Sequence, residues 1–229
     1  IDEDFVNLFQ FFVLFAITKF PKCKATGSAD EQIVRPGMGE TLRYLIHNSR
    51  FKKGILAQFL YVGMQVAVWS FTIRLALTID PNLNERLAAN FMVYSFICFF
   101  IGKFIANFLM AKFSPNKVLM VYSVIGSLFL LYISFVPDIS VVYVAVAASV
   151  LFGPCWATIY AKTLEAVDKK YTETAGAVIV MSIIGGACVP AVQGMVSDLT
   201  GSMQLSFVVN LLCFMAVGKY FYDECQYEK

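Results

Sequence analysis

The sequence predicts an all-α transmembrane protein, and two observations lead to this fold class. Hydrophobic residues make up 59% of the 229 residues and charged residues only 15%, with a mean hydropathy of +0.68. A water-soluble domain of this length could not bury so much apolar surface in one core. In addition, six stretches of the chain each hold about 20 mostly apolar residues, the length at which a helix crosses a hydrocarbon layer of about 30 Å.

The six full spans follow one another along the chain, separated by turn-forming sequences such as DPNLN and VPDIS. Their predicted ranges are 54–79, 88–111, 117–136, 139–164, 174–196 and 203–222. Ahead of them, FVNLFQFFVLFAITKF is apolar but short, which indicates either the end of a span whose beginning is missing or a thin span in its own right. The predicted organisation is therefore a helix remnant at 1–20, a polar linker at 21–53 with a short surface helix in GETLRYLIHNSRF, and a six-helix bundle at 54–229.

Lysines and arginines are distributed unevenly between the two sets of loops. If the linker is cytoplasmic, the loops at 103–117 and 162–170 and the C-terminal tail lie on the same side as the linker. Only Arg74 and Arg86, of 18 basic residues, then lie on the other side. The positive-inside rule therefore predicts a multi-pass protein of the plasma (inner) membrane with a cytoplasmic C-terminus.

The residues that usually form metal, disulfide or catalytic sites do not cluster in this sequence. The six cysteines show no CxxC motif and no pairing with the single histidine. We therefore expect neither a disulfide framework nor a metal site, and interpret the cysteines as small packing residues. The spans also hold no paired acids and no Ser/His pair, so neither an intramembrane enzyme nor a cofactor or nucleic-acid partner is expected.

A polar stripe runs along one face of the first full span. On a helix with 100° per residue, its four side chains fall within roughly 60° of one another; they are Gln58, Tyr61, Gln65 and Trp69. An unsatisfied amide in lipid costs several kcal/mol, so the stripe should face protein or water. Two interpretations stay open: hydrogen bonds between neighbouring helices, or a wet cavity in which amides and an indole meet a hydroxyl-rich solute.

The fourth full span carries a second stripe at an overlapping depth. Its members are spaced by four, three, four and three residues, which places them on one helical face; they are Ser149, Gly153, Trp156, Tyr160 and Thr163. Pro154 adjoins this face and frees a backbone carbonyl, as occurs where a membrane helix lines a cavity. Two such stripes favour a shared pocket for a carbohydrate, with ordinary helix packing as the alternative for Trp156 and Tyr160.

Acidic side chains are missing from the interior of every full span. Proton-driven transporters generally need a titratable group inside the membrane. If the protein is such a transporter, this chain alone does not supply the group that binds the proton.

Four segments carry a resemblance to a known family: AQFLYVGMQVAVWSFTIR, GKFIANFLMAKFSPNKVL, FGPCWATIYAKTLEAV and GAVIVMSIIGGACVPAVQGMVSDLTG. They are similar to the C-terminal half of the fucose:proton symporter family of the major facilitator superfamily. The similarity extends over residues 51–222, and 5–21 resembles the end of the sixth helix of that family. Two departures are Lys103, where an arginine is more usual, and Cys155-Trp156, where the family more often has aromatic or methionine surroundings.

The resemblance implies a carrier made of two six-helix bundles with alternating access, of which this chain would be the C-terminal bundle, helices seven to twelve, after a remnant of helix six. The implied function is import of L-fucose or a related hexose together with protons, across the lipid bilayer. The family's coupling carboxylates lie in the N-terminal bundle, which is expected to be the partner of this chain. The chain is expected to be a fragment of a longer gene, with an N-terminal bundle on a separate chain as the alternative. The residues expected to bind the monosaccharide are Gln58, Tyr61, Gln65, Trp69, Trp156 and Tyr160.

Two alternatives stay open at this stage. The first is a sodium-linked glucose or galactose carrier of the same family, and the second is a non-transporting membrane scaffold or sensor bundle.

Overall fold

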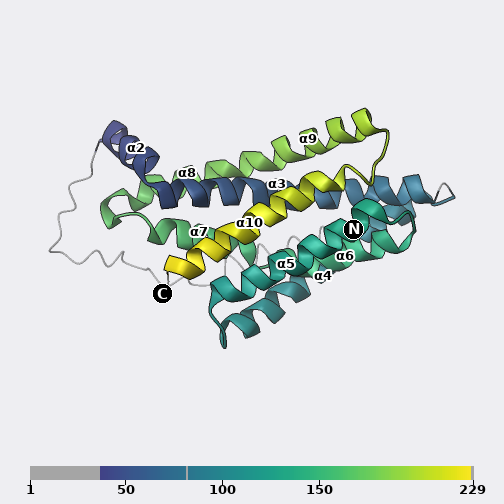
Figure 1. Ribbon diagram of the computed structural model, residues 1–229, viewed down its shortest axis with the longest axis horizontal. Coiled ribbons are helices and arrows are strands. Elements are labelled where there is room, and N and C mark those ends of the chain that lie inside the picture. The colour runs from purple at the N-terminus through teal and green to yellow at the C-terminus, as the bar shows by residue number, and fades with distance from the viewer. Residues whose placement is uncertain (1–36, 81, 228–229) are drawn as a thin grey trace, which may run out of the picture. The chain divides into compact units, whose positions relative to one another are not determined.

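The structure is a computed structural model that describes residues 37–80 and 82–227 of the chain. The regular elements of these residues are all helical, as predicted (Figure 1). In chain order they are α2 (Met38–His47), α3 (Ser49–Ile79), α4 (Glu85–Met110), α5 (Pro115–Phe135), α6 (Ser140–Phe152), α7 (Cys155–Glu165), α8 (Thr172–Met181), α9 (Gly185–Thr200) and α10 (Phe207–Tyr227), with short 3-10 turns at Lys169–Tyr171 and Ser182–Ile184. The helix remnant expected at 1–20 and the first part of the linker, 21–36, lie outside the described residues.

Five helical stretches of the described chain are long and apolar enough to cross a membrane. They are Ser49–Ile79, Glu85–Met110, Pro115–Phe135, Ser140–Glu165 and Lys169–Thr200, and they correspond to the first five predicted spans. The sixth predicted span corresponds to α10, which is one continuous helix. It falls outside this group because Lys219, Asp223 and Glu224 all lie toward its C-terminal end.

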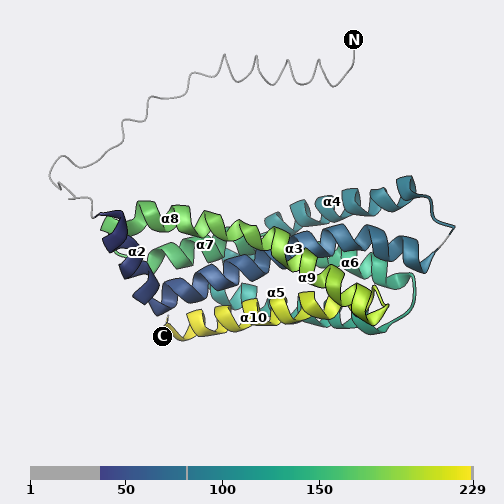
Figure 2. The same cartoon turned by 90° about the horizontal axis from the view of Figure 1, so that it is seen from above.

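Helix α3 occupies the centre of the bundle, where it contacts α4, α6, α7, α9 and α10 (Figures 1 and 2). Tyr61, Met64 and Leu75 of α3 are among the largest fully buried side chains. Cys155 of α7 and Cys213 of α10 are buried in the same hydrophobic core. The first polar stripe therefore lies on the central helix of the bundle.

Two glycines allow α4 to approach the end of α6 without intervening side chains. A Cβ atom on Gly102 would lie 2.0 Å from the carbonyl oxygen of Val150, and one on Gly153 would lie 2.9 Å from Cγ of Lys103. These contacts leave no room for a larger residue in either helix. As a result, Lys103 packs directly against the junction of α6 and α7.

The span predicted at 139–164 is divided in the structure, because α6 ends at Phe152 and α7 begins at Cys155. Pro154 lies in the break, and it has no N–H with which to continue the helical hydrogen bonds. Beside the break, the carbonyl oxygen of Phe152 accepts a hydrogen bond from the hydroxyl of Tyr61, at 2.5 Å. Pro154 thus marks a break in the span, and α3 supplies a partner for the carbonyl beside it.

The described part of the linker is helical and is attached to the bundle. Helix α2 overlaps the predicted surface helix at 39–51 but begins one residue earlier, and α3 begins at Ser49, before the expected start of the span at 54. Asn48 joins the two helices to the end of α7: its Oδ1 accepts a hydrogen bond from the Phe51 N–H at 3.1 Å, and its Nδ2 donates one to the Ala166 carbonyl at 2.7 Å.

Two ion pairs connect the start of α3 to the end of α10. Nη2 of Arg50 lies 2.5 Å from Oε2 of Glu224, whose side chain is only 2% exposed. Nζ of Lys53 lies 2.7 Å from Oδ2 of Asp223, and both of these side chains are more exposed, at 47% and 27%. The central helix and the last described helix are therefore joined by charge as well as by apolar packing.

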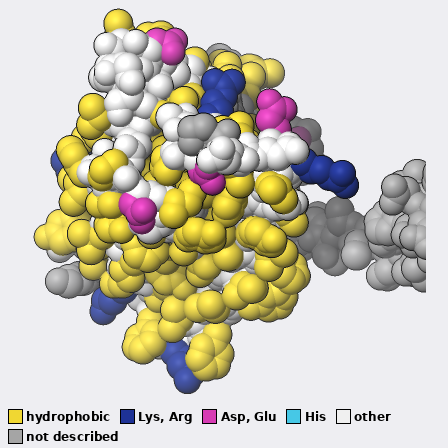
Figure 3. Space-filling model, turned by 90° about the vertical axis from the view of Figure 1, so that its right-hand side faces the viewer, with side chains coloured by type: hydrophobic (Ala, Val, Ile, Leu, Met, Phe, Trp, Pro, Cys, Tyr) yellow, Lys and Arg dark blue, Asp and Glu magenta, His cyan; other side chains and the backbone are white. Residues whose placement is uncertain are grey.

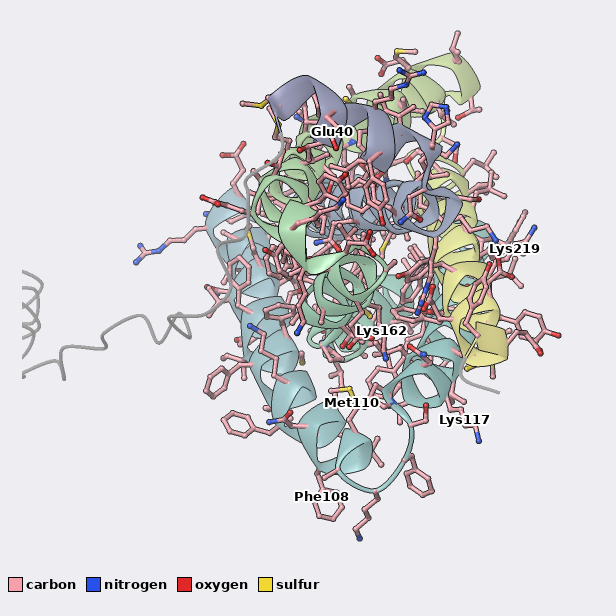
Figure 4. All side chains as sticks on the ribbon, turned by 90° about the vertical axis from the view of Figure 1, so that its left-hand side faces the viewer. Glu40, Phe108, Met110, Lys117, Lys162 and Lys219 are labelled. Atoms are coloured by element: carbon pink, nitrogen blue, oxygen red, sulfur yellow. The ribbon has the colours of Figure 1, made fainter. Side chains whose placement is uncertain are left out.

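Large apolar side chains cover much of the outside of the bundle. On α4, phenylalanines recur every four residues and are 43 to 63% exposed; they are Phe96, Phe100, Phe104 and Phe108. Figure 4 shows Phe108 pointing away from the bundle. Figure 3, which views the opposite end, shows hydrophobic side chains over much of the surface. Such a surface suits contact with lipid or with another apolar bundle.

Candidate functional site

A cavity of about 450 Å³ lies between α3, α4 and the break between α6 and α7. Gln65 reaches it from α3, Phe99, Lys103 and Asn107 from α4, and Trp156 and Thr158 from α7. Amide, ammonium, hydroxyl and indole groups therefore meet at one concave site with partly apolar walls. This combination is typical of sites that bind small molecules and orient them through a few polar contacts.

Two of the residues predicted from the two stripes, Gln65 and Trp156, line this cavity together. Trp156 is 36% exposed, so part of its indole remains accessible. Tyr160 stacks against it, with ring centroids 5.5 Å apart and an angle of 12° between the ring planes. Tyr160 therefore supports the orientation of Trp156 from the next turn of α7.

Trp69 lies beside the cavity and contacts one of its walls. Its Nε1 donates a hydrogen bond to Oγ of Ser149 at 3.2 Å, which joins the two predicted stripes directly. Its ring meets that of Phe99 edge-on, with centroids 5.2 Å apart. Nζ of Lys103 lies 4.5 Å from the centroid of the same Phe99 ring. Phe99 therefore contacts both Trp69 and the ammonium of Lys103.

Gln58 and Tyr61 lie deeper in the bundle, and neither lines the cavity. Both side chains are fully buried. The Tyr61 hydroxyl is engaged with the carbonyl of Phe152. Neither Nε2 nor Oε1 of Gln58 has a hydrogen-bond partner among the described residues. A direct role of these two residues in solute binding stays a prediction from the sequence.

Three polar residues of the cavity were not selected as site residues from the sequence: Lys103, Asn107 and Thr158. The four residues that α4 contributes to the cavity are spaced by four, four and three, a regular helical face that could have indicated them; they are Phe99, Lys103, Asn107 and Met110. This face was hidden in the sequence because apolar residues also cover the other sides of α4.

The electrostatics of the cavity are set by Lys103. Its ammonium carries three hydrogen-bond donors, and none of the ion pairs found in the described part of the chain includes it. Gln65 and Asn107 offer both amide donors and carbonyl acceptors, and Thr158 offers a hydroxyl. The lining contains no carboxylate. The cavity is thus suited to a solute rich in hydroxyl groups.

Comparisons with known proteins bear directly on this arrangement. The chain is 31% identical to the L-fucose-proton symporter of Escherichia coli K12 over 205 residues, which are 90% of this chain and 46% of the relative. A crystal structure of the fucose:proton symporter FucP of E. coli matches it with a TM-score of 0.79 and 30% identity, covering 94% of this chain and 52% of that one. The chain is homologous to the C-terminal half of the L-fucose–proton symporter.

Other matches extend the symporter homology. The Haemophilus influenzae L-fucose-proton symporter is 27% identical over 91% of this chain, and a putative glucose/galactose transporter of Helicobacter pylori J99 is 29% identical over 77%. A second FucP structure, in the outward conformation, also matches with a TM-score of 0.79. No protein-family model matches the chain.

The symporter homology confirms the predicted architecture, the C-terminal six-helix bundle of a major facilitator superfamily transporter, and with it a multi-pass membrane protein. These homologues are transporters and not enzymes, in agreement with the prediction from the sequence. The chain spans about half the length of the curated relatives that it matches.

Proposed function

We propose that this chain is the solute-binding C-terminal bundle of a sugar transporter that works by alternating access, with L-fucose or a related hexose as the solute and protons as the coupling ion. One observation carries the proposal. The cavity joins the indole of Trp156 to the polar groups of Gln65 and Lys103, in a bundle homologous to half of a fucose–proton symporter.

In the proposed complex, the indole of Trp156 packs on the C–H face of the sugar ring. The amides of Gln65 and Asn107, the hydroxyl of Thr158 and the ammonium of Lys103 form hydrogen bonds with the sugar hydroxyls. A site built to bind several hydroxyl groups discriminates against analogues that lack one of them, because its own polar groups are then left unpaired. Tyr160 positions the indole, and Phe99 positions the ammonium.

The coupling part of the proposal assigns the proton site to a partner bundle. No carboxylate lines the cavity, and the buried Glu224 is held by Arg50 at the far end of α10. We therefore place the titratable group in the N-terminal bundle, against which this bundle moves as a unit to open the site alternately to each side. In this arrangement the end of the bundle that holds the C-terminus faces the cytoplasm.

Tryptophan fluorescence tests the binding site on this chain directly. The chain has two tryptophans, so Trp69→Phe leaves Trp156 as the reporter. Titration with L-fucose or D-galactose should give a saturable change in emission. In the same background, Lys103→Met should weaken binding by about tenfold or more, since a hydrogen bond to a charged group contributes about 1.5–3 kcal/mol.

The matched control is Lys112→Met, because the Lys112 ammonium lies over the ring of Phe108 and outside the cavity lining. Equal losses in the two lysine variants, or no saturable change with either sugar, would contradict the proposed site.

Uptake into proteoliposomes tests the coupling ion, with this bundle reconstituted together with its N-terminal partner. A proton gradient should drive accumulation of radiolabelled L-fucose. Accumulation driven by sodium would support the sodium-linked glucose or galactose carrier, the alternative favoured by the similarity to the H. pylori transporter. Saturable binding without uptake under either gradient would favour a sensor or scaffold.

A further inference from the structure

A second hollow lies between α5 and α10, and it is a groove of about 600 Å³. It shares no lining residue with the cavity that contains Trp156. Its walls are mainly apolar, with Leu128 and Leu131 on α5 and Leu211 and Met215 on α10. Three of these four side chains are also strongly exposed: Leu128 at 59%, Met215 at 55% and Leu131 at 43%.

We propose that this groove binds an acyl chain of an anionic phospholipid, whose phosphate is held by Lys219 at one end of the groove. The three features that point to this ligand are the chemistry of the walls, the length of the groove and the charge at its mouth.

The two serine hydroxyls in the walls of the groove already have hydrogen-bond partners. Ser123 donates its hydroxyl to the carbonyl of Leu119 at 2.8 Å, and Ser127 donates its hydroxyl to the carbonyl of Ser123 at 2.7 Å. Neither hydroxyl proton is left for a polar ligand. A hydrocarbon chain can therefore lie along α5 without leaving a buried donor unpaired.

The length of the groove matches one leaflet of a bilayer. On α5 its lining extends from Met120 to Leu131, which is roughly 16 Å at 1.5 Å per helical residue. Half of a hydrocarbon core of about 30 Å is about 15 Å. The groove is therefore long enough for an acyl chain that reaches from the membrane surface to the bilayer centre.

Basic and aromatic residues lie at one end of the groove. Lys219 and Tyr222 line it from α10, and Lys117 lies three residues before Met120, on the adjoining turn of α5. Figure 4 shows Lys219 and Lys117 on the side of the bundle formed by α10 and α5. A tyrosine beside lysines is typical of the level of the lipid headgroups.

The charge of Lys219 remains available to a phosphate. The carboxylate nearest to it along α10, Asp223, is paired with Lys53 at 2.7 Å. The ion pairs found in the described part of the chain do not include Lys219. Positive residues next to an anionic leaflet gain attraction from it. Charge complementarity therefore favours an anionic headgroup over a zwitterionic one.

Native mass spectrometry of the purified chain tests this site. Phosphatidylglycerol and phosphatidylcholine with identical acyl chains are added in turn, and the bound lipid is counted. Phosphatidylglycerol should bind more tightly. Lys219→Gln should weaken phosphatidylglycerol binding about fivefold and leave phosphatidylcholine unchanged, the effect expected for one lysine at an anionic surface. Ser127→Leu, which fills the groove, should weaken the binding of both lipids.

Lys112→Gln is the matched control, because it removes a charge at the same end of the bundle without touching the groove. Equal binding of the two lipids, or equal effects of Lys112→Gln and Lys219→Gln, would overturn the proposal. A Leu128→Cys variant tests for another occupant: rapid oxidative cross-linking between copies of the chain would show that the groove docks a second copy instead. Circular dichroism and gel filtration verify that each variant is folded. If Ser127→Leu does not fold, Val124→Phe replaces it as the variant that fills the groove.

Discussion

The hydroxyl of Tyr61 donates a hydrogen bond to the carbonyl oxygen of Phe152 at 2.5 Å, and both residues are fully buried. This contact joins the central helix α3 to the end of α6, next to the break that leads to Trp156. The position of the cavity wall thus depends on a polar contact inside the core.

Tyr61→Phe removes this hydrogen bond and leaves a buried carbonyl without its partner. We expect a loss of about 1–3 kcal/mol in the free energy of unfolding, the usual effect of an unsatisfied buried group. Thermal unfolding in mild detergent measures it. Tyr143→Phe is the control, because Tyr143 of α6 is 60% exposed. Equal unfolding temperatures for the two variants would contradict a structural role for the Tyr61 hydroxyl.

Gln58→Met should stabilise the bundle. The Gln58 amide is fully buried and has no hydrogen-bond partner in the described residues, and a buried unpaired polar group destabilises a protein by about 1–3 kcal/mol. Methionine has a similar length and no such groups. Thermal unfolding should therefore shift upward, while Gln65→Met, at the cavity, should weaken sugar binding in the fluorescence titration. A lower unfolding temperature together with lost binding in Gln58→Met would instead support Gln58 as a solute ligand.

The two ion pairs between α3 and α10 should differ strongly in their effect on stability. Arg50→Met leaves the Glu224 carboxylate, 2% exposed, without its partner, and breaking a buried pair in this way costs about 3–5 kcal/mol. Lys53→Met breaks an exposed pair that contributes about 0–1 kcal/mol. Denaturant unfolding of both variants at the same salt concentration measures the difference. Similar losses would show that the Arg50 pair is as solvated as the Lys53 pair.

Gly102→Ala should disturb the packing of α4 on α6. The added Cβ would lie 2.0 Å from the Val150 carbonyl oxygen, so backbone has to move, and overpacking of this kind costs about 1–3 kcal/mol or more. Gly194→Ala is the control, since its Cβ would meet only Cζ of Phe71, at 3.8 Å. An unchanged unfolding temperature in Gly102→Ala would contradict the close approach of α4 and α6.

The helices of this fold could be predicted from the sequence because a membrane helix must be long and apolar, and those properties are local. The packing contacts between helices were harder to predict from the sequence. Gly185 and Gly186 are neighbours in the sequence, but a Cβ on Gly185 would lie 2.1 Å from the Phe59 carbonyl oxygen of α3, whereas one on Gly186 would lie 3.4 Å from Cγ2 of Val66. The sequence cannot tell which of two adjacent glycines makes the close contact, since this depends on how the two helices are rotated against each other.

The site was predictable only where a polar group stands out against an apolar helix. Gln65 and Trp156 did so, and the structure brings them to one cavity. Gln58 shares a helical face with Gln65 but lies outside that cavity. The two residues are about two turns apart, and over that length a stripe can pass from an open region into a closed core. The contribution of α4 was missed, because the regular spacing of its cavity residues is masked by apolar residues on its other sides, and the contact of Lys103 with Gly153 joins two helices that are far apart in the sequence.

The ion pair of Arg50 and Glu224 joins residues that are 174 positions apart in the chain. Closing so long a loop is entropically unfavourable until many contacts form together, so the bundle can close only after α10 has entered the bilayer. Until then, the flank of α3 that α10 will cover remains open to lipid, with the Arg50 guanidinium unneutralised. Biogenesis of this bundle should therefore pass through a vulnerable intermediate, and a mutation that delays insertion of α10 would reduce the amount of protein in the membrane through proteolytic quality control rather than through altered transport.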